Sequence, residues 1–333
     1  MARIVAIAVL LILTTAQPVW PQAAGSGADQ TDAAAAAADQ GAPSQVAVPG
    51  ALPPNANIDT IPAKRLFGSF KRPTTGAARA IGFYSKGCMS GAAQLPLTDP
   101  SPDPAWQVMR PSRNRNWANP AMVSLVERLA RDAKKYDSWN GLLVGDMSQP
   151  RGGPMASGHA SHQVGLDADV WLTPMPTRIL TTAERENMSA KLVVKDRKTI
   201  DNAVWDDAHA RLIKRAASYP EVERIFVHPP IKAALCQWAT GDRSWLAKVR
   251  PYFGHNYHFH IRIACPKDSP TCKPQPVARP QDGTGCGKEL AWWMGDIPWT
   301  KPKRNPNAPP VKPPPPLTLS GLPAECRAVV LGH

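Results

Sequence analysis

The clearest hydrophobic pattern in the chain is a helical one in residues 119–136. Asn119 and Pro120 are a typical N-cap and first-turn pair. The apolar positions that follow recur three and four residues apart: Met122, Val123, Val126, Leu129, Ala130, Ala133 and Tyr136. This spacing predicts a helix that packs through one face. Thr181 and Glu184 have the spacing of a capping box for a second helix, and the apolar spacing of residues 206–219 predicts a third.

Short apolar runs predict the strands. They cover residues 141–144, 169–172, 224–227 and 257–263. Helices and strands are interspersed, but the strands are too short and too irregularly spaced for a doubly wound parallel sheet. We therefore expect an α+β fold, a small and mostly antiparallel sheet with flanking helices.

The two ends of the chain differ in composition from its middle. Arg3 and the apolar run 4–13 precede small and polar residues, which predicts a signal peptide over residues 1–24; a retained N-terminal anchor is the alternative. Residues 25–60 lack large apolar side chains and are expected to be a flexible leader. Residues 65–295 form the expected domain, and residues 296–333 a proline-rich C-terminal strap. We expect an exported, periplasmic protein without an integral membrane span.

Cysteine usage agrees with export. The chain has six cysteines, an even number, and none forms a Cys-x-x-Cys pair. In an oxidising compartment they should form disulfides that staple the domain. The residues alone leave the connectivity open, although Cys265 and Cys272 are close enough to close a small loop. The alternative is free thiols in a cytosolic protein. It requires in addition that residues 1–24 are not a signal peptide.

The chain carries 39 basic and 26 acidic residues, a net charge of +13. Removing a signal peptide that contains only Arg3 leaves 38 basic residues and a net charge of +12. A basic surface favours polyanionic partners, and an exported protein meets anionic wall polymer before nucleic acid. Because the charge is spread along the chain, we expect a solvated basic surface and no nucleic-acid partner.

Histidines cluster in two short segments. Seven of the eight lie between positions 159 and 260. The segment GHASHQVGLDADVW holds His159, His162, Asp167 and Asp169, and the segment GHNYHFHIRI holds His255, His258 and His260. Residues two apart in a strand share a face, so His258 and His260 project together while Phe259 faces the packed side. Imidazoles with one carboxylate are a normal donor set for catalytic zinc. The alternative is a chance cluster of surface or core histidines.

Other hydrolytic motifs are absent from the sequence. It has no His-Glu-x-x-His, no Ser-x-x-Lys and no Gly-x-Ser-x-Gly segment. Attack by a metal-activated water molecule is therefore the only hydrolytic mechanism for which the sequence contains recognisable residues.

Three segments carry a family resemblance. GDMSQPRGGPMASGHASHQVGLDADVW, RIFVHPPIKAALC and GHNYHFHIRIAC closely resemble the penicillin-insensitive murein endopeptidases. That family is grouped with lysostaphin-type and D-Ala-D-Ala-cleaving metallopeptidases, which share His-x(6)-Asp and His-x-His. Here these patterns are His162 to Asp169 and His258 to His260. The resemblance covers about residues 80–295, without the leader or the proline-rich tail.

The resemblance implies roles for individual residues. The Zn²⁺ ligands would be His162, Asp169 and His260. His258 would be the general base or transition-state stabiliser, with His255 and His159 completing the site. The implied disulfides are Cys88–Cys326, Cys236–Cys286 and Cys265–Cys272. The implied reaction is hydrolysis of D-alanyl to meso-diaminopimelyl cross-links of peptidoglycan, insensitive to penicillin because no serine is acylated.

Some alternatives stay open. Asp167 either orients a histidine or only caps backbone groups, and His228 either enters the site or is structural. The rival functions are a D-Ala-D-Ala-type carboxypeptidase and a catalytically inactive zinc-containing protein that binds the wall. The sequence does not decide whether the protein is a homodimer.

Overall fold

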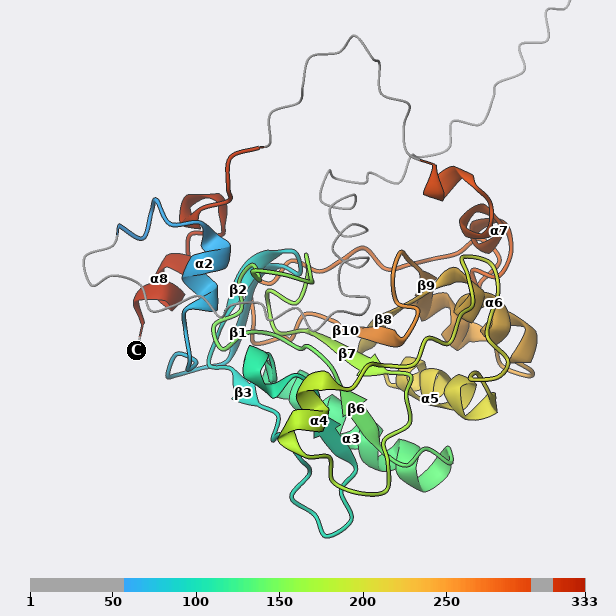
Figure 1. The fold of residues 1–333 in the computed structure, drawn as a ribbon. Coiled ribbons are helices and arrows are strands. Elements are labelled where there is room, and N and C mark those ends of the chain that lie inside the picture. The colour runs from blue at the N-terminus through green and yellow to red at the C-terminus, as the bar shows by residue number, and fades with distance from the viewer. Residues whose placement is uncertain (1–56, 301–313, 333) are drawn as a thin grey trace, which may run out of the picture.

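A six-stranded mixed sheet forms the centre of the molecule in a computed structural model, which describes residues 57–300 and 314–332 (Figure 1). The predicted signal peptide, nearly all of the predicted leader and part of the proline-rich segment lie outside these residues. The strand order is β4-β6-β7-β10-β8-β9. The strands are β4 (Trp106–Val108), β6 (Leu142–Val144), β7 (Asp167–Trp171), β8 (Val222–Val227), β9 (Val249–Pro251) and β10 (His258–Ile263).

Antiparallel pairing dominates the middle of this sheet. Strand β10 pairs antiparallel with both β7 and β8, and β6 pairs antiparallel with β7. Only the outer pairs, β4 with β6 and β8 with β9, are parallel. Two small ladders lie beside the sheet: β1 (Arg79–Phe83) with β2 (Lys86–Ser90), and β3 (Ala93–Gln94) with β5 (Trp117–Ala118). The α+β prediction with a mostly antiparallel sheet is confirmed.

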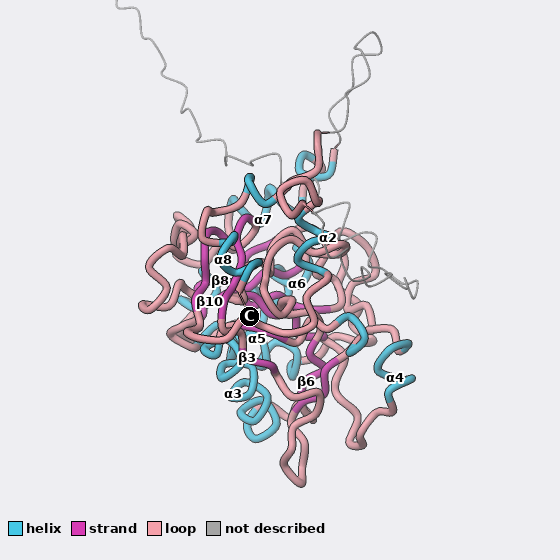
Figure 2. Tube along the Cα trace, turned by 90° about the vertical axis from the view of Figure 1, so that its left-hand side faces the viewer, coloured by secondary structure: helices cyan, strands magenta, loops and turns pink. Residues whose placement is uncertain are grey.

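Helices α3 (Pro120–Tyr136) and α5 (Asp207–Ser218) pack on one face of this sheet (Figures 1 and 2). The Asn119 side chain caps α3 by accepting from the Ala121 amide, and Asp206 caps α5. The apolar positions that predicted both helices supply buried residues of the main core. Helix α4 (Thr182–Asn187) has the predicted capping box, but it buries no residue and ends after six.

Several elements were not predicted, because they are short or lack a periodic apolar pattern. Helix α6 (Pro229–Trp238) begins with two prolines, which suit a first helical turn. The other unpredicted helices are α2 (Ala63–Gly68), α7 (Lys288–Met294) and α8 (Cys326–Leu331), with 3-10 turns η1 (Pro111–Arg113), η2 (Ser244–Lys248), η3 (Ile297–Trp299) and η4 (Leu319–Gly321). Strand β7 begins two residues before its predicted start, so it includes Asp167.

A second, smaller core joins the two ends of the described chain. Helices α2 and α8 lie beside β1 and β2, at the left of Figure 1. Leu66 and Phe67 of α2 pack there with Val329 and Val330 of α8. Among residues 57–300 and 314–332, none of the helices has the length and apolarity that crossing a bilayer requires.

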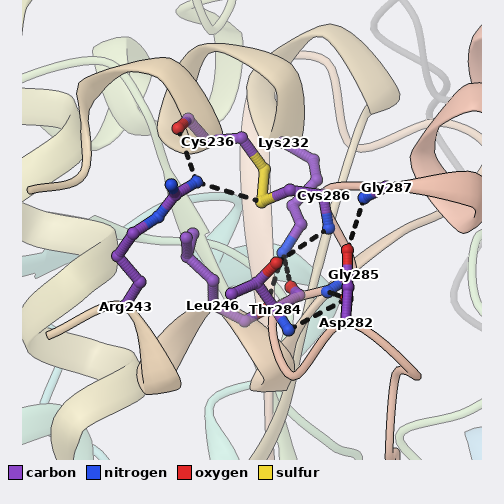
Figure 3. Close-up of a disulfide and its surroundings, with 9 residues drawn as sticks. All are labelled: Lys232, Cys236, Arg243, Leu246, Asp282, Thr284, Gly285, Cys286 and Gly287. Carbon is purple, nitrogen blue, oxygen red and sulfur yellow. Dashed lines mark hydrogen bonds between the residues drawn. A yellow bond between two sulfur atoms is a disulfide. The ribbon is translucent and has the colours of Figure 1, made fainter.

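Three disulfides staple the fold, and they are the three pairs that the resemblance implies. Cys236–Cys286 joins α6 to the segment before α7 (Figure 3). Lys232 on α6 is buried beside it, and its Nζ donates to the carbonyls of Leu246 at 2.6 Å and Thr284 at 2.7 Å. Like the disulfide, this buried lysine links α6 to the segment that precedes α7.

Candidate metal centre

Strands β7 and β10 divide their side chains between the two faces of the sheet. Ala168, Val170, Phe259 and Ile261 face the main core. The alternate positions lie on the opposite face, because side chains alternate along a strand. In the register, His260 pairs with Asp169, and Arg262 pairs with Asp167. The predicted projection of His258 and His260 to one side, with Phe259 to the other, agrees with this arrangement.

His162 comes from the loop that leads into β7. It is fully buried and has a left-handed backbone, with φ of 66°, a conformation uncommon outside glycine. Its amide donates to Asp167 Oδ2 at 3.0 Å, and its carbonyl accepts from the Ser148 hydroxyl at 2.5 Å. Gly165 in the same loop has φ of 71°, and a Cβ there would lie 2.8 Å from the Asn119 nitrogen. Close packing thus fixes the loop that presents His162.

Three atoms that could bind a metal ion converge on this face. Asp169 Oδ1 lies 3.5 Å from His162 Nε2 and 3.5 Å from His260 Nδ1. The other nitrogen of each ring is already engaged: His162 Nδ1 lies 2.6 Å from the Met147 carbonyl, and His260 Nε2 lies 2.8 Å from Asp167 Oδ1. Donation by those nitrogens leaves a lone pair on the atom that faces Asp169, as is usual for metal-binding histidines.

The burial of these atoms suits the binding of a metal cation. His162 Nε2 and Asp169 Oδ1 are buried without a hydrogen-bond partner among residues 57–300 and 314–332. Buried polar atoms are rarely left without a partner, and an imidazole lone pair beside a carboxylate oxygen is a donor set for zinc. Burial lowers the pKa of His260 to about 4, so its ring is neutral near pH 7, the form that binds a metal.

His159 lies on the other side of Asp169. Its Nε2 is 3.5 Å from Asp169 Oδ2 and 3.2 Å from Asp146 Oδ2. Ligand atoms of His159, His162 and Asp169 all lie within 4.8 Å of one another, which makes a second candidate set of three. Burial opposes the protonation of His159, but Asp169 and Asp146 raise its pKa overall. A raised pKa favours the protonated ring, which can donate a proton but cannot bind a metal.

Asp146 is a site residue that the sequence analysis missed. It is buried and accepts from Arg115 at 2.7 Å and Arg113 at 3.1 Å, as well as contacting His159. Burial would raise the pKa of Asp146, but the two guanidinium groups hold it well below its usual range. Its position two residues after strand β6 was an available signal, because side chains at strand ends often line sites.

The remaining predicted histidines lie around the same carboxylate. His258 Nε2 is 3.7 Å from Asp169 Oδ2, and the His255 ring is 5.0 Å from the His258 ring between centroids. His255 also has a left-handed backbone, with φ of 55°. Burial, with His258 and His260 nearby, holds the pKa of His255 well below its ordinary value. The two sequence segments therefore meet in one cluster.

His228 reaches this cluster through its backbone. Its amide donates to the His255 carbonyl at 3.1 Å, while its ring lies tilted against the Trp299 ring, with centroids 5.6 Å apart. Asp167 contacts the His260 ring as well as the His162 amide, so it does not only cap a backbone group. Arg262, which donates to Asp167 from Nε at 2.7 Å, was not singled out from the sequence.

Comparisons with known proteins identify the family of this chain. The sequence model of the family described as penicillin-insensitive murein endopeptidase matches residues 80–331. A protein of that name from Haemophilus influenzae is 45% identical over 254 residues, which cover 74% of this chain and 84% of the relative. Relatives of the same name from Yersinia enterocolitica (39% identical, 83% and 94% covered) and Klebsiella pneumoniae (40% identical, 79% and 89% covered) are also similar. The chain belongs to the penicillin-insensitive murein endopeptidase family.

Proposed function

We propose that this protein is a zinc-dependent endopeptidase that hydrolyses the D-alanyl to meso-diaminopimelyl cross-links of peptidoglycan and is insensitive to penicillin. The observation that carries the proposal is the convergence of His162 Nε2 and His260 Nδ1 on Asp169 Oδ1, each at 3.5 Å. The names of the relatives support murein as the substrate. The predicted signal peptide, residues 1–24, supports action in the periplasm.

We assign the metal ligands to His162, Asp169 and His260 rather than to the set that contains His159. In the first set, both nitrogens face the same carboxylate oxygen, and both rings use their second nitrogen as a donor. His159 instead directs its Nε2 towards two carboxylates, Asp146 and Asp169. Because this one nitrogen faces both carboxylates, a proton on it is favoured, and a protonated nitrogen has no lone pair for a metal; in His260 the proton lies on the other nitrogen, which faces Asp167.

The histidines around the ligands supply the proton transfers. His162, Asp169 and His260 would hold the zinc ion, which when bound would supply a Lewis acid for the scissile carbonyl and for a water molecule. His258 accepts the proton of the attacking water and then donates it to the leaving amine, since it lies beside Asp169 but is not in the ligand set. The His255 ring packs against the His258 ring, with centroids 5.0 Å apart. His159 stabilises the oxyanion of the transition state from the opposite side of Asp169.

The test is an assay on purified cross-linked muropeptide dimers. The protein should convert dimers to monomers, lose this activity with a chelator, regain it with Zn²⁺, and keep it in the presence of penicillin. Release of a terminal D-alanine without loss of dimers would identify a carboxypeptidase instead. Zinc binding without either product would identify an inactive protein that binds the wall.

A further inference from the structure

We propose that Asp167 and Arg262 form a positioning pair that sets the geometry of the metal site before any metal binds. The inference rests on the proposed zinc site and adds two residues to it. Neither residue is a proposed ligand. Their role is to fix which atom of His260 faces Asp169 and how the His162 backbone is held.

A single carboxylate, that of Asp167, joins two proposed ligands that come from distant parts of the chain. Oδ1 lies 2.8 Å from His260 Nε2 on β10, and Oδ2 accepts from the His162 amide at 3.0 Å. The first contact makes Nε2 the donor and so leaves Nδ1 facing Asp169. The second stabilises His162 in its left-handed conformation, which a residue other than glycine rarely adopts without support.

Arg262 holds Asp167 from directly across the sheet. The two residues are register partners between β7 and β10. The guanidinium donates from Nε to Oδ1 at 2.7 Å and from Nη2 to Oδ2 at 3.4 Å. Arg262 therefore contacts both oxygens of Asp167, and these oxygens in turn contact the proposed ligands His260 and His162. A lysine would retain the charge but not the fork that engages two oxygens at once.

The surroundings of Arg262 fix the guanidinium in turn. The Arg262 Cζ atom lies 4.1 Å from the centre of the Tyr84 ring and 5.1 Å from the centre of the Phe226 ring. Nη1 donates to Gln275 Oε1 at 2.7 Å. Arg262 is only 5% exposed and Asp167 is fully buried. The pair is thus held by aromatic rings and an amide, which suits a fixed support more than a mobile substrate contact.

A purely structural ion pair would also be buried, so the test needs a matched control. The chain offers one in Asp137, which is 4% exposed and pairs with both Nε and Nη2 of Arg215. That pair joins the C-terminus of α3 to α5, and within the described part of the chain the hydrogen bonds of Asp137 reach none of the clustered histidines. Asp137→Asn therefore breaks a similar ion pair without touching the site.

The experiment measures Zn²⁺ binding by the purified full chain in competition with a chelating dye, with no murein present. Asp167→Asn and Arg262→Gln should each weaken zinc affinity by roughly 10- to 100-fold, the usual effect of removing a partner of a ligand. Arg262→Lys should fall between these variants and the wild type. Asp137→Asn should stay within about twofold of the wild type, since its ion pair lies outside the supporting contacts.

A second measurement reads the tautomer directly in metal-free protein. In nitrogen-15 histidine spectra, His260 of the wild type and of Asp137→Asn should carry its proton on Nε2. Asp167→Ala should lose this single tautomer, because no oxygen remains at that position to accept from Nε2. If the Asp167 variants do not fold, Arg262→Gln and the wild-type tautomer still carry the test.

The outcomes separate this inference from the proposed function. A wild type that binds no zinc would overturn both. A wild type that binds zinc, with unchanged affinity in Asp167→Asn and Arg262→Gln, would overturn the positioning pair alone. An Nδ1-protonated His260 in the metal-free wild type would do the same.

Discussion

Cys88 on β2 and Cys326 on α8 form a disulfide across 238 residues of sequence. The contacts around this bond continue towards the metal site. Gly87, next to Cys88, donates to Gln163 Oε1 at 3.2 Å, and Gln163 follows the proposed ligand His162. Arg151 donates from Nη1 to the carbonyls of Val329 and Val330 at 2.9 and 3.0 Å. The C-terminal helix is therefore packed against the segments that support the His162 loop.

The first prediction concerns this long-range bond. Cys88→Ala with Cys326→Ala should lower the free energy of unfolding by about 5 kcal/mol, since loss of a cross-link restores the most chain entropy to the unfolded state when the loop is long. Cys265→Ala with Cys272→Ala opens a separation of only 7 residues, and the same relation gives about 2 kcal/mol. Denaturant unfolding measures both. Equal losses would contradict the entropic explanation.

The second prediction concerns Asp146. Asp146→Ala should lower the free energy of unfolding by about 3 to 5 kcal/mol, because it leaves the Arg115 guanidinium buried without its carboxylate. Asp103→Ala is the control, since Asp103 is exposed where it pairs with Lys134; it should cost about 1 kcal/mol or less. A loss for Asp146→Ala as small as that of the control would show that Arg115 is not held by this pair.

Local signals in the sequence predicted the elements that those signals control. Asn119 caps α3 at the expected residue because its own side chain satisfies a free amide of the first turn. The alternation in His258, Phe259 and His260 placed both histidines on one face because side-chain direction in a strand depends only on spacing. The family resemblance supplied the disulfide pairing, which the spacing of the cysteines left open.

The support of the site was not predictable in the same way. Asp146 meets His159 only because β6 and β7 are neighbours, and this pairing depends on the whole sheet. Arg262 appears in the sequence as one more strand residue with a charge. Its partner Asp167 is 95 residues away. Contacts of this kind follow from strand order and register, which no short segment specifies.

The third prediction concerns pH and Lys232. Burial, with Arg250 nearby, lowers the pKa of Lys232 to about 7, and the two N–H groups of its neutral amine match the two carbonyls it contacts. In the unfolded chain the pKa returns to about 10.4. Between these values the unfolded state binds the extra proton, so the free energy of unfolding should rise with pH, by roughly 2 to 4 kcal/mol from pH 7 to 10.

Lys232→Met should lack this rise, and urea unfolding at several pH values between 7 and 10 would measure it. Lys64→Met is the control, because Lys64 is an exposed residue of α2; it should keep the pH dependence of the wild type. The same slope in Lys232→Met as in the wild type would mean that another group titrates in this window.

The last prediction separates a ligand from a catalyst on strand β10. His258 and His260 share a face, but only His260 directs a nitrogen to Asp169 Oδ1 at 3.5 Å with its other nitrogen held by Asp167. His258→Ala should therefore keep nearly stoichiometric zinc and lose about two to four orders of magnitude in rate, the usual contribution of a positioned acid or base. His260→Ala should lose both zinc and activity.

Metal analysis and muropeptide assays on the two variants decide the assignment together. The control is His209→Ala, because His209 is equally buried but contacts Asp206 and the Leu172 carbonyl on the helix side of the sheet. This variant should keep zinc and turnover, whatever stability it loses, since it removes neither a ligand nor a proton carrier. Zinc lost from His258→Ala and kept in His260→Ala would exchange the two roles. Zinc kept in both variants would indicate that the third ligand is His159, whose Nε2 lies 3.5 Å from Asp169 Oδ2.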